Sequence, residues 1–302
     1  MKKTIALWAA LTAIALFAAT GCTTADADAP DPAASTATPA AGDKAPGTAP
    51  KDPNAPKDPN APKHPGAGAP DAAAAVAAAY RKWGLKPLPA PPAPPAKKPT
   101  TRTAGGPVPV ISDIETDQKV VFLTIDDGAE KDPRFVEMMK DLKVPVTMFL
   151  TDAAIRADYG YFEPLLSQGH GLANHTLTHP NLRTLSADAQ RREICGQQER
   201  LAKRYGIRPR LFRPPYGNWN EATRAAAGQC GVDAIVLWRE SMQIQNMQYQ
   251  RGDKKLHPGD IILAHFRGPS ELKGRTMTEM TANLLRHIEE QGFTVARLED
   301  YV

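Results

Sequence analysis

Large apolar side chains are scarce in the first part of the chain. Residues 23–110 contain only two aromatic residues, Tyr80 and Trp83, while 20 of the 29 prolines in this 302-residue chain precede residue 110. A segment with so few large apolar groups cannot bury enough surface to offset the entropy cost of folding. We therefore predict a disordered Ala/Pro-rich linker over residues 23–110 and one folded domain over residues 111–302, a length that suffices for a single hydrophobic core.

The folded part also lacks an excess of positive charge. The chain has a formal net charge of +4, but residues 1–110 carry 12 Lys and Arg against 7 Asp, whereas residues 111–302 carry 25 basic and 26 acidic side chains. A near-neutral domain has no overall positive field to drive contacts with phosphates. We therefore expect no nucleic-acid partner.

Cysteine is rare as well, with three residues, and the first of them ends an apolar segment. Two lysines precede an apolar run over residues 4–19, which is typical of an export signal and short for a permanent membrane span. The end of this segment, Ala19-Thr20-Gly21-Cys22, resembles the lipobox of bacterial lipoproteins. The resemblance implies a signal peptide over residues 1–22 and a lipidated Cys22. The exported protein would then be a membrane-anchored lipoprotein that faces the cell wall or the extracellular space. An ordinary cleaved signal and an uncleaved anchor are the alternatives.

The other two cysteines are Cys195 and Cys230. In a chain destined for an oxidising compartment, this remaining pair predicts a disulfide. Closing such a loop contributes about 3 to 4 kcal/mol in the chain-entropy model. Two unpaired, buried cysteines are the alternative, since a free cysteine packs as a small apolar side chain.

The proline-rich segment contains a short repeat and one candidate helix. The sequence Lys-Asp-Pro-Asn-Ala-Pro occurs twice in succession over residues 51–62, and this composition is typical of extended, polyproline-like chain. The alanine-rich stretch from Asp71 to Trp83 favours a short helix, because alanine has the highest helix propensity and Asp71 can cap the first turn. We interpret the segment as a spacer.

The pattern changes after Asp113 to apolar runs that alternate with amphipathic segments. We expect strands at 120–124, 144–150, 171–173, 210–213, 234–238, 260–265 and 293–297, and helices at 132–142, 162–168, 187–205, 220–229 and 277–290. Repeated strand–helix units predict an α/β fold with a parallel sheet, either open or closed into a barrel. Chemistry in such folds gathers at the carboxyl ends of the strands.

Two polar motifs follow expected strands. Asp126 and Asp127 end the first strand, where adjacent carboxylates repel each other unless a cation or a catalytic task compensates. His175 and His179 follow the third strand with a spacing that lets both imidazoles bind one metal. Together with Asp127 they offer two nitrogens and one oxygen, and they leave an open position for water, as catalytic zinc sites do. A turn with surface carboxylates is the alternative for the first motif.

Two further motifs follow later strands. Arg213-Pro214-Pro215-Tyr216-Gly217 predicts a rigid turn that presents a guanidinium, an aromatic ring and a free backbone amide. Leu263-Ala264-His265 ends another strand with a histidine. Taken alone, the first of these motifs is typical of an ordinary turn, and the second is typical of a histidine at a strand end whose hydrogen bonds are satisfied. Their occurrence in this order, together with the two earlier motifs, favours a functional site.

The sequence resembles a known family at these four places. The segments 124–128, 175–179, 213–217 and 263–265 resemble the first, second, third and fifth motifs of the NodB-homology polysaccharide deacetylases, carbohydrate esterase family four. The resemblance covers about residues 115–300. It implies a distorted (β/α) barrel that uses a divalent metal, often zinc, to remove acetyl groups from N-acetylglucosamine polymers or from acetylated xylan.

The resemblance also implies a role for each motif residue. It assigns the general base to Asp126, the metal ligands to Asp127, His175 and His179, the support of the base to Arg213, an oxyanion donor to the Tyr216 backbone amide, the general acid to His265, and the lining of the acetyl pocket to Leu263. In this scheme His265 is an imidazolium that protonates the departing amine.

The family's fourth motif is incomplete in this chain. Of its two tryptophans and two spaced aspartates, only Trp238 is present, as a candidate substrate contact. The aspartate that would support His265 is missing unless Glu240 or another residue supplies the charge, and Phe266 stands where a carboxylate often follows the histidine. We therefore expect an active enzyme with an altered substrate groove.

The sequence thus predicts a monomeric, metal-dependent hydrolase that removes acetyl groups from an amino-sugar polymer such as peptidoglycan or a chitin-like glycan. The incomplete fourth motif leaves open a catalytically silent module that binds cell-wall glycan. An O-acetyl esterase acting on xylan is a further alternative, since it needs no amine leaving group.

Overall fold

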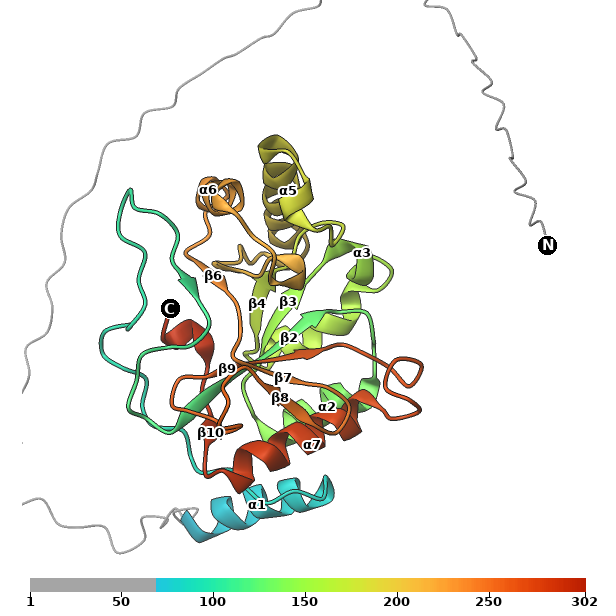
Figure 1. The fold of residues 1–302 in the computed structure, drawn as a ribbon. Coiled ribbons are helices and arrows are strands. Elements are labelled where there is room, and N and C mark those ends of the chain that lie inside the picture. The colour runs from blue at the N-terminus through green and yellow to red at the C-terminus, as the bar shows by residue number, and fades with distance from the viewer. Residues whose placement is uncertain (1–68) are drawn as a thin grey trace, which may run out of the picture. The chain divides into compact units, whose positions relative to one another are not determined.

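The computed structural model of the chain describes residues 69–302, which form one folded unit (Figure 1). The helices are α1 Ala69–Lys82, α2 Pro133–Leu142, α3 Asp152–Ile155, α4 Glu163–Ser167, α5 Ala187–Tyr205, α6 Glu221–Gln229 and α7 Met277–Glu290. The strands are β1 Val110–Ile111, β2 Val120–Asp127, β3 Thr147–Leu150, β4 Gly171–Asn174, β5 Leu211–Phe212, β6 Ala234–Val236, β7 Glu240–Met242, β8 Met247–Tyr249, β9 Ile261–His265 and β10 Thr294–Val295.

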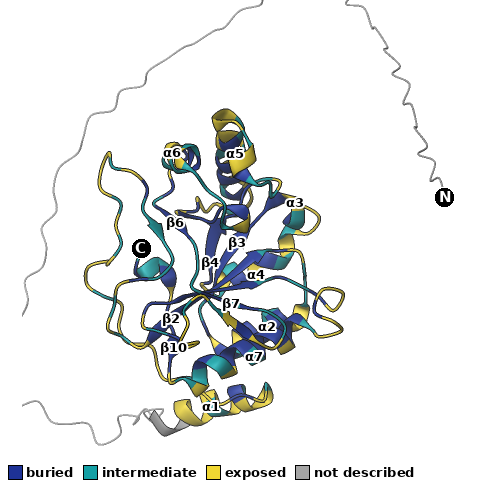
Figure 2. Ribbon diagram, viewed as in Figure 1, coloured by how far each residue is buried: buried dark blue, intermediate teal, exposed yellow. Residues whose placement is uncertain are grey.

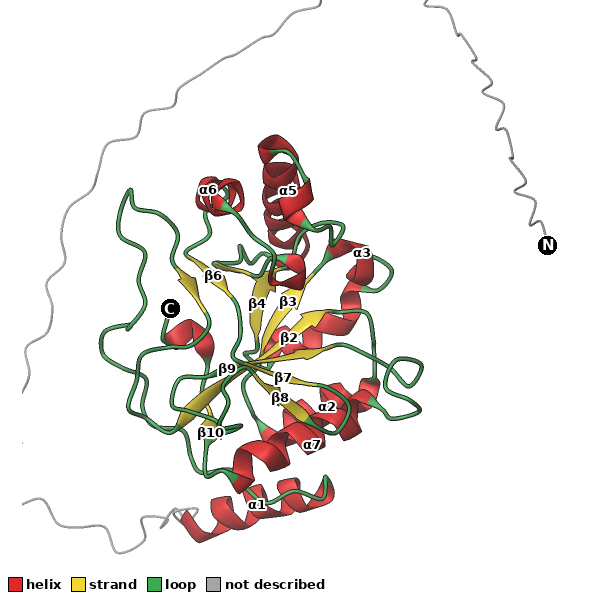
Figure 3. Cartoon of the chain, in the orientation of Figure 1, coloured by secondary structure: helices red, strands yellow, loops and turns green. Residues whose placement is uncertain are grey.

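The strands form a curled sheet in the order β1-β6-β5-β4-β3-β2-β9-β7-β8, and β10 pairs with β2 beside this path. All neighbours are parallel except β7 and β8, which form an antiparallel pair. Helices lie around the outside of the curled sheet (Figure 3). The expected α/β fold, a distorted (β/α) barrel, is confirmed. Its central strands are buried, as their dark colour in Figure 2 shows.

Local signals in the sequence account for the helix ends. Asp132 caps α2 by accepting a hydrogen bond from the backbone N–H of Arg134, and a proline follows at the first helical position. Ser186 caps the start of α5, and Gly206 ends that helix in the left-handed conformation. Thr276 and Glu279 form a reciprocal capping box at the start of α7. These helices agree closely with the expected ranges.

Residues 69–110 differ from the predicted linker. The alanine-rich stretch does form a helix, α1, but this helix packs on the domain through Tyr80, which is 5% exposed, and Leu85, which is 8% exposed, packs there just after the helix ends. Lys82 reaches Glu137 and Asp141 of α2 at 2.7 Å each, and the Trp83 indole N–H donates to Asp141 at 2.9 Å. The few apolar side chains of this segment complete the core of the domain instead of building one of their own.

The segment after α1 also follows the domain surface. The hydroxyl of Thr294 donates to the Pro89 carbonyl, Arg102 donates to the carbonyls of Gly228 and Val232, and Val108 is 1% exposed. Strand β1 then pairs with β6. The folded unit therefore begins well before the predicted boundary at residue 111.

The predicted signal peptide over residues 1–22, its Cys22, and the repeat over residues 51–62 lie outside the described residues. Within residues 69–302, no helix is both long enough and apolar enough to cross a membrane.

The sequence analysis did not predict the hairpin of β7 and β8. These three-residue strands, Glu-Ser-Met and Met-Gln-Tyr, mix polar and apolar residues and are too short to show a strand period. The hairpin widens the sheet beyond β9 and forms one wall of the region around His265.

Candidate active site

The predicted site residues meet at the carboxyl edge of the sheet. Asp126 and Asp127 end β2, and Asp126 lies beside His265 of β9 in the strand register. His175 follows β4 directly, and Arg213 follows β5, which is the next strand. Because parallel strands end at the same edge, residues more than 130 positions apart in the chain come together there.

Asp127, His175 and His179 form a compact group of potential metal ligands. Each offers one ligand atom, and the three atoms lie within 4.8 Å of one another. The Oδ1 atom of Asp127 lies 3.5 Å from Nε2 of His175 and 3.3 Å from Nε2 of His179. The sequence prediction that these three side chains lie together agrees with this geometry.

The chemistry of these donors fits a divalent cation. Oδ1 of Asp127 is buried and has no hydrogen-bond partner among the described residues, a costly arrangement unless a cation binds there. Nδ1 of His175 lies 2.7 Å from the Arg213 carbonyl, which fixes the ring so that Nε2 faces Asp127. Burial lowers the pKa of His175 to about 4, so the imidazole is neutral and its Nε2 lone pair is free for a metal.

The backbone is strained around this group. Seven residues other than glycine have positive φ in the described part of the chain, and four of them are at the site: Asp127, Thr176, His179 and Tyr216. Such conformations cost about 1 to 3 kcal/mol each and persist only where the surrounding structure imposes them. Two of these four residues, Asp127 and His179, are candidate metal ligands. The strained backbone therefore lies where side chains must converge to bind one metal ion.

Arg213 and Asp126 form a buried pair beside the metal-ligand group. The Arg213 side chain is fully buried, and its Nη1 donates to Asp126 Oδ1 at 2.6 Å and to the Thr124 hydroxyl at 2.8 Å. Its remaining nitrogens donate to the carbonyls of Val236 and Leu237. Every part of the guanidinium is thus held in place, and it fixes one oxygen of Asp126.

The second oxygen of Asp126 faces the metal-ligand group. Oδ2 lies 3.7 Å from Nε2 of His175. Burial raises the pKa of Asp126 to about 6, and the charge and hydrogen bond of Arg213 oppose this rise. A carboxylate with a pKa near 6 suits a general base at neutral pH, because it is ionised yet still accepts protons readily.

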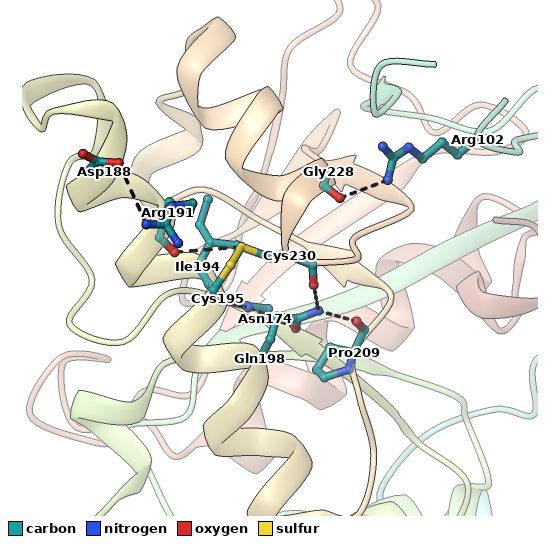
Figure 4. Close-up of a disulfide and its surroundings, with 10 residues drawn as sticks. All are labelled: Arg102, Asn174, Asp188, Arg191, Ile194, Cys195, Gln198, Pro209, Gly228 and Cys230. Carbon is teal, nitrogen blue, oxygen red and sulfur yellow. Dashed lines mark hydrogen bonds and ion pairs between the residues drawn. A yellow bond between two sulfur atoms is a disulfide. The ribbon is translucent and has the colours of Figure 1, made fainter. Parts of the chain in front are cut away.

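A polar network links the metal-ligand loop to the disulfide (Figure 4). Cys195 of α5 and Cys230 at the end of α6 are joined by a disulfide, the pairing that the cysteine count predicts. The side-chain amide of Gln198 donates to the Cys230 carbonyl, and its carbonyl oxygen accepts from Asn174. Asn174 directly precedes His175 and also accepts from the backbone N–H of Thr176. The disulfide therefore braces the helices behind the histidine loop.

His265 lies on the same face of the sheet as Asp126, but its surroundings are different. Burial and the positive charge of Arg267 lower the pKa of His265 to about 3. No carboxylate forms an ion pair with it among residues 69–302. The histidine is therefore neutral at neutral pH in the free protein, which differs from the predicted imidazolium. The physical reason is that burial disfavours the charged ring, and the nearby cations add to this effect.

Glu240 does not supply the missing charge. It pairs with Ile262 of β9, and Ile262 belongs to the core on the outer face of the sheet. Because side chains alternate along a strand, Glu240 points away from the face that carries Leu263 and His265. Ser241, which pairs with Leu263, and Gln243 stand on the His265 side. Both are uncharged.

Glu240 instead belongs to a buried acidic pair. It lies beside Asp260, and both side chains are fully buried. Arg251 contacts Asp260 at 2.6 Å and Glu240 at 3.6 Å. Burial, followed by the charge of Asp260, raises the pKa of Glu240 to about 8. The sequence did not predict this role. A shift of one residue in the pairing of β7 with β9 would turn Glu240 to the other face of the sheet, and the sequence alone does not reveal that pairing.

The three predicted substrate contacts lie around the same edge. The Tyr216 ring is 63% exposed and packs edge-on against His179, with the ring centres 4.9 Å apart. Trp238 packs near the Arg213 guanidinium and closes over Gly217, where an added Cβ would lie 3.0 Å from the indole. Leu263 is 4% exposed and pairs with Thr124, one step below Asp126 on the same face. Phe266 is buried in the core against Phe135 and Phe162.

A curled parallel sheet with a His-His-Asp group and a buried Asp–Arg pair at its carboxyl edge indicates the class of metal-dependent hydrolases. Residues 113–235 match the family model for polysaccharide deacetylase. An uncharacterized protein of Streptomyces coelicolor is 46% identical over 195 residues, which cover 64% of this chain and 77% of that protein. The chain belongs to the polysaccharide deacetylase family, the NodB-homology or family 4 carbohydrate esterases.

Relatives with named activities are more distant. The peptidoglycan-N-acetylmuramic acid deacetylase PdaA of Bacillus subtilis is 27% identical over 195 residues, which cover 61% of this chain and 72% of that protein. The solved structure of a family 4 carbohydrate esterase from Bacillus anthracis is similar with a TM-score of 0.53 at 25% identity, and the match covers 64% of this chain and 86% of that one.

Proposed function

We propose that the chain is a metal-dependent deacetylase that removes N-acetyl groups from an amino-sugar polymer of the cell wall. The single observation that carries this proposal is the fully buried pair of Arg213 and Asp126, which holds one carboxylate oxygen and leaves the other facing the metal-ligand group. A module for binding alone has no need of a positioned base with a pKa near 6. The relative PdaA, a peptidoglycan deacetylase, supports the substrate class.

In this proposal, different residues have different roles in amide hydrolysis. Asp127, His175 and His179 would hold a divalent metal, and we propose zinc because two imidazoles and one carboxylate form a typical zinc set. When bound, the metal supplies Lewis acidity, which polarises the acetyl carbonyl and lowers the pKa of a water. Asp126 accepts the proton of the attacking water, and Arg213 keeps it in position.

The remaining residues act on the carbonyl oxygen and on the leaving group. The backbone N–H of Tyr216 would donate to the oxyanion that develops on the carbonyl. Leu263 would line the space for the acetyl methyl group, and Trp238 would bound the groove near Arg213. His265 begins as a neutral imidazole beside Asp126 in the strand register. It would take up the proton that Asp126 removes from the water and, as imidazolium, give that proton to the nitrogen of the breaking C–N bond, so that the amine leaves neutral.

The leader sequence and the disulfide support a location outside the cytoplasm. A disulfide between Cys195 and Cys230 persists in an oxidising compartment. We propose that the domain is exported and held to a membrane through a lipid on Cys22, facing the cell-wall polymer that it deacetylates.

Acetate release from chitooligosaccharides, peptidoglycan and acetylxylan, measured on the full chain with zinc and with a chelator, tests the proposal. We expect release from an N-acetylated glycan, its loss with chelator, and a fall of about 10² to 10⁴-fold in the Asp126→Asn variant. The exposed Asp188→Asn is the matched control, because it removes a carboxylate outside the site. Equal, negligible release by the wild type and Asp126→Asn on every glycan would contradict the proposal.

A further inference from the structure

A cavity opens beside His265, on the side away from the metal-ligand group. Its volume is about 270 Å³, and its walls come from the end of β7 and from the loop that joins β9 to α7. His265, Gln243, Arg267 and Lys273 line it, with Glu271 as its only acidic side chain. Because His265 lines it, the cavity is open to a substituent next to a leaving nitrogen that reaches His265.

The cavity carries an excess of positive charge. Nε of Arg267 lies 3.7 Å from Glu271, a long contact between side chains that are 37% and 53% exposed, so Glu271 neutralises it weakly. Lys273 forms no ion pair with any residue of the described part of the chain. Arg267 is close enough to lower the pKa of His265 and to oppose the rise at Asp126. The positive charge thus reaches the site itself.

The positive lining continues away from His265. A second cavity of about 360 Å³ shares Gln243, Ile244, Leu272 and Lys273 with the first, adds Arg275, and has no acidic side chain in its lining. A third, of about 390 Å³, shares Gln245 and Arg275 with the second and reaches α1, α2 and α7, where Arg134 and Arg286 line it. Its one acidic side chain is Glu279, which lies 3.2 Å from Arg275. The three cavities are neighbours that share wall residues, and we call them together the cationic groove.

We propose that the cationic groove binds anionic substituents of the glycan, so that the enzyme prefers a polymer carrying carboxylate or phosphate groups over a neutral one. This inference rests on the proposed deacetylase function and names the chemistry of its substrate. The residues that carry it are Arg267, Lys273 and Arg275.

Two features of the molecule support this choice of ligand. The guanidinium fork matches carboxylate and phosphate groups, and Lys273 adds a point charge. On the side toward His265, β7 carries Ser241, and Gln243 follows directly after the strand, so neither position places a negative charge there that would repel an anion. Residues 111–302 are near neutral as a whole, and the positive charge is therefore a local property of this path.

Three tetrasaccharides of equal length test the proposal. The first is neutral and made of N-acetylglucosamine, the second alternates it with N-acetylmuramic acid and carries carboxylates, and the third is the neutral one with phosphate esters. The readout is the ratio of kcat/KM for each anionic sugar to kcat/KM for the neutral one, measured with the zinc-loaded full chain. The two anionic arms distinguish a carboxylate from a phosphate source.

We expect the wild type to prefer at least one anionic sugar. In the Lys273→Gln/Arg275→Gln variant, the ratio of the two kcat/KM values should fall about tenfold, since each of the two removed charges is partly exposed and contributes modestly. The preference should also shrink at high salt. The matched control is Lys254→Gln/Lys255→Gln, which removes two exposed charges outside the groove. If the Lys273→Gln/Arg275→Gln variant, the groove variant, has the same ratio as the wild type, the inference is overturned.

The outcome separates this inference from the proposed function. If the neutral sugar is deacetylated and the groove variant changes no ratio, the groove inference fails alone. If no sugar releases acetate, the proposed function fails. The groove is then judged by calorimetric titration of the same sugars, where an equal Kd for neutral and anionic sugars overturns it.

Discussion

The metal side of the site, formed by the ends of β2, β4 and β5, is much more densely connected than the acid side, formed by β7 and β9. On the metal side several functional groups have partners that fix them: Arg213 holds Asp126, the Arg213 carbonyl orients His175, and Asn174 and Gln198 tie the histidine loop to the disulfide. On the acid side, His265 forms no ion pair with a carboxylate of the described residues, and the cavity beside it has Arg267 and Lys273 with Glu271 as the only acidic side chain.

The difference shows which part of the chemistry tolerates variation. The metal-ligand group works only with all its donors in place, because removal of one leaves buried charges uncompensated. The acid side meets the substrate, so its neighbours can change with the glycan.

Removing one histidine from each side should separate the two roles most clearly. His175→Ala should lose the bound metal and slow acetate release by at least about 10³-fold, because it removes a metal ligand. His265→Ala should keep the metal and slow release by about 10² to 10³-fold, because it removes only the proton donor. Metal content by mass spectrometry and acetate assays measure both. Loss of metal in His265→Ala would contradict the division.

The disulfide should stabilise the metal side. Replacing both cysteines in Cys195→Ala/Cys230→Ala should lower the free energy of unfolding by about 3 to 4 kcal/mol, because the unfolded chain regains the freedom of a 35-residue loop. Guanidinium unfolding of the oxidised wild type and of the variant measures this difference. A difference in the free energy of unfolding below about 1 kcal/mol would show that the disulfide contributes little to stability.

Of these substitutions, Glu240→Gln should have the smallest effect on activity. Its effect should be seen in the pH dependence of the free energy of unfolding. The folded pKa of Glu240 is about 8, above its ordinary value of 4.5. Between these values the unfolded chain has lost this proton while the folded chain keeps it, so the contribution of Glu240 to stability falls as pH rises. The variant should therefore gain stability relative to the wild type from pH 5 to pH 8, by up to about 1.4 kcal/mol per pH unit.

Unfolding at several pH values and one acetate assay check the Glu240→Gln prediction. We expect acetate release within about threefold of the wild type, because the side chain faces away from His265. A hundredfold loss would mean that Glu240 does support the acid, and the contrast between the two sides would then disappear.

Features of the fold that depend on local signals were predictable from the sequence. The ends of α5 follow from Ser186 and Gly206, which lie next to the helix itself. The metal-ligand group was predictable because the spacing of His175 and His179 is local and Asp127 ends a neighbouring strand. Features set by distant pairings were not predictable. The direction of Glu240 depends on the β7–β9 register, and the docking of α1 depends on partners such as Glu137, which lies 55 residues after Lys82.

The pairing of β1 with β6 has a consequence for any shorter form of this protein. A fragment cut where the family resemblance begins would lack Val110, which pairs with Ile235. Strand β6 would keep β5 on one side and have an unpaired edge on the other. The cut would also uncover the surfaces beneath Tyr80 and Val108. An open strand edge beside exposed apolar surface is a template for sheet-to-sheet association between molecules. The segment that joins the tail to the domain thus also protects the domain against aggregation.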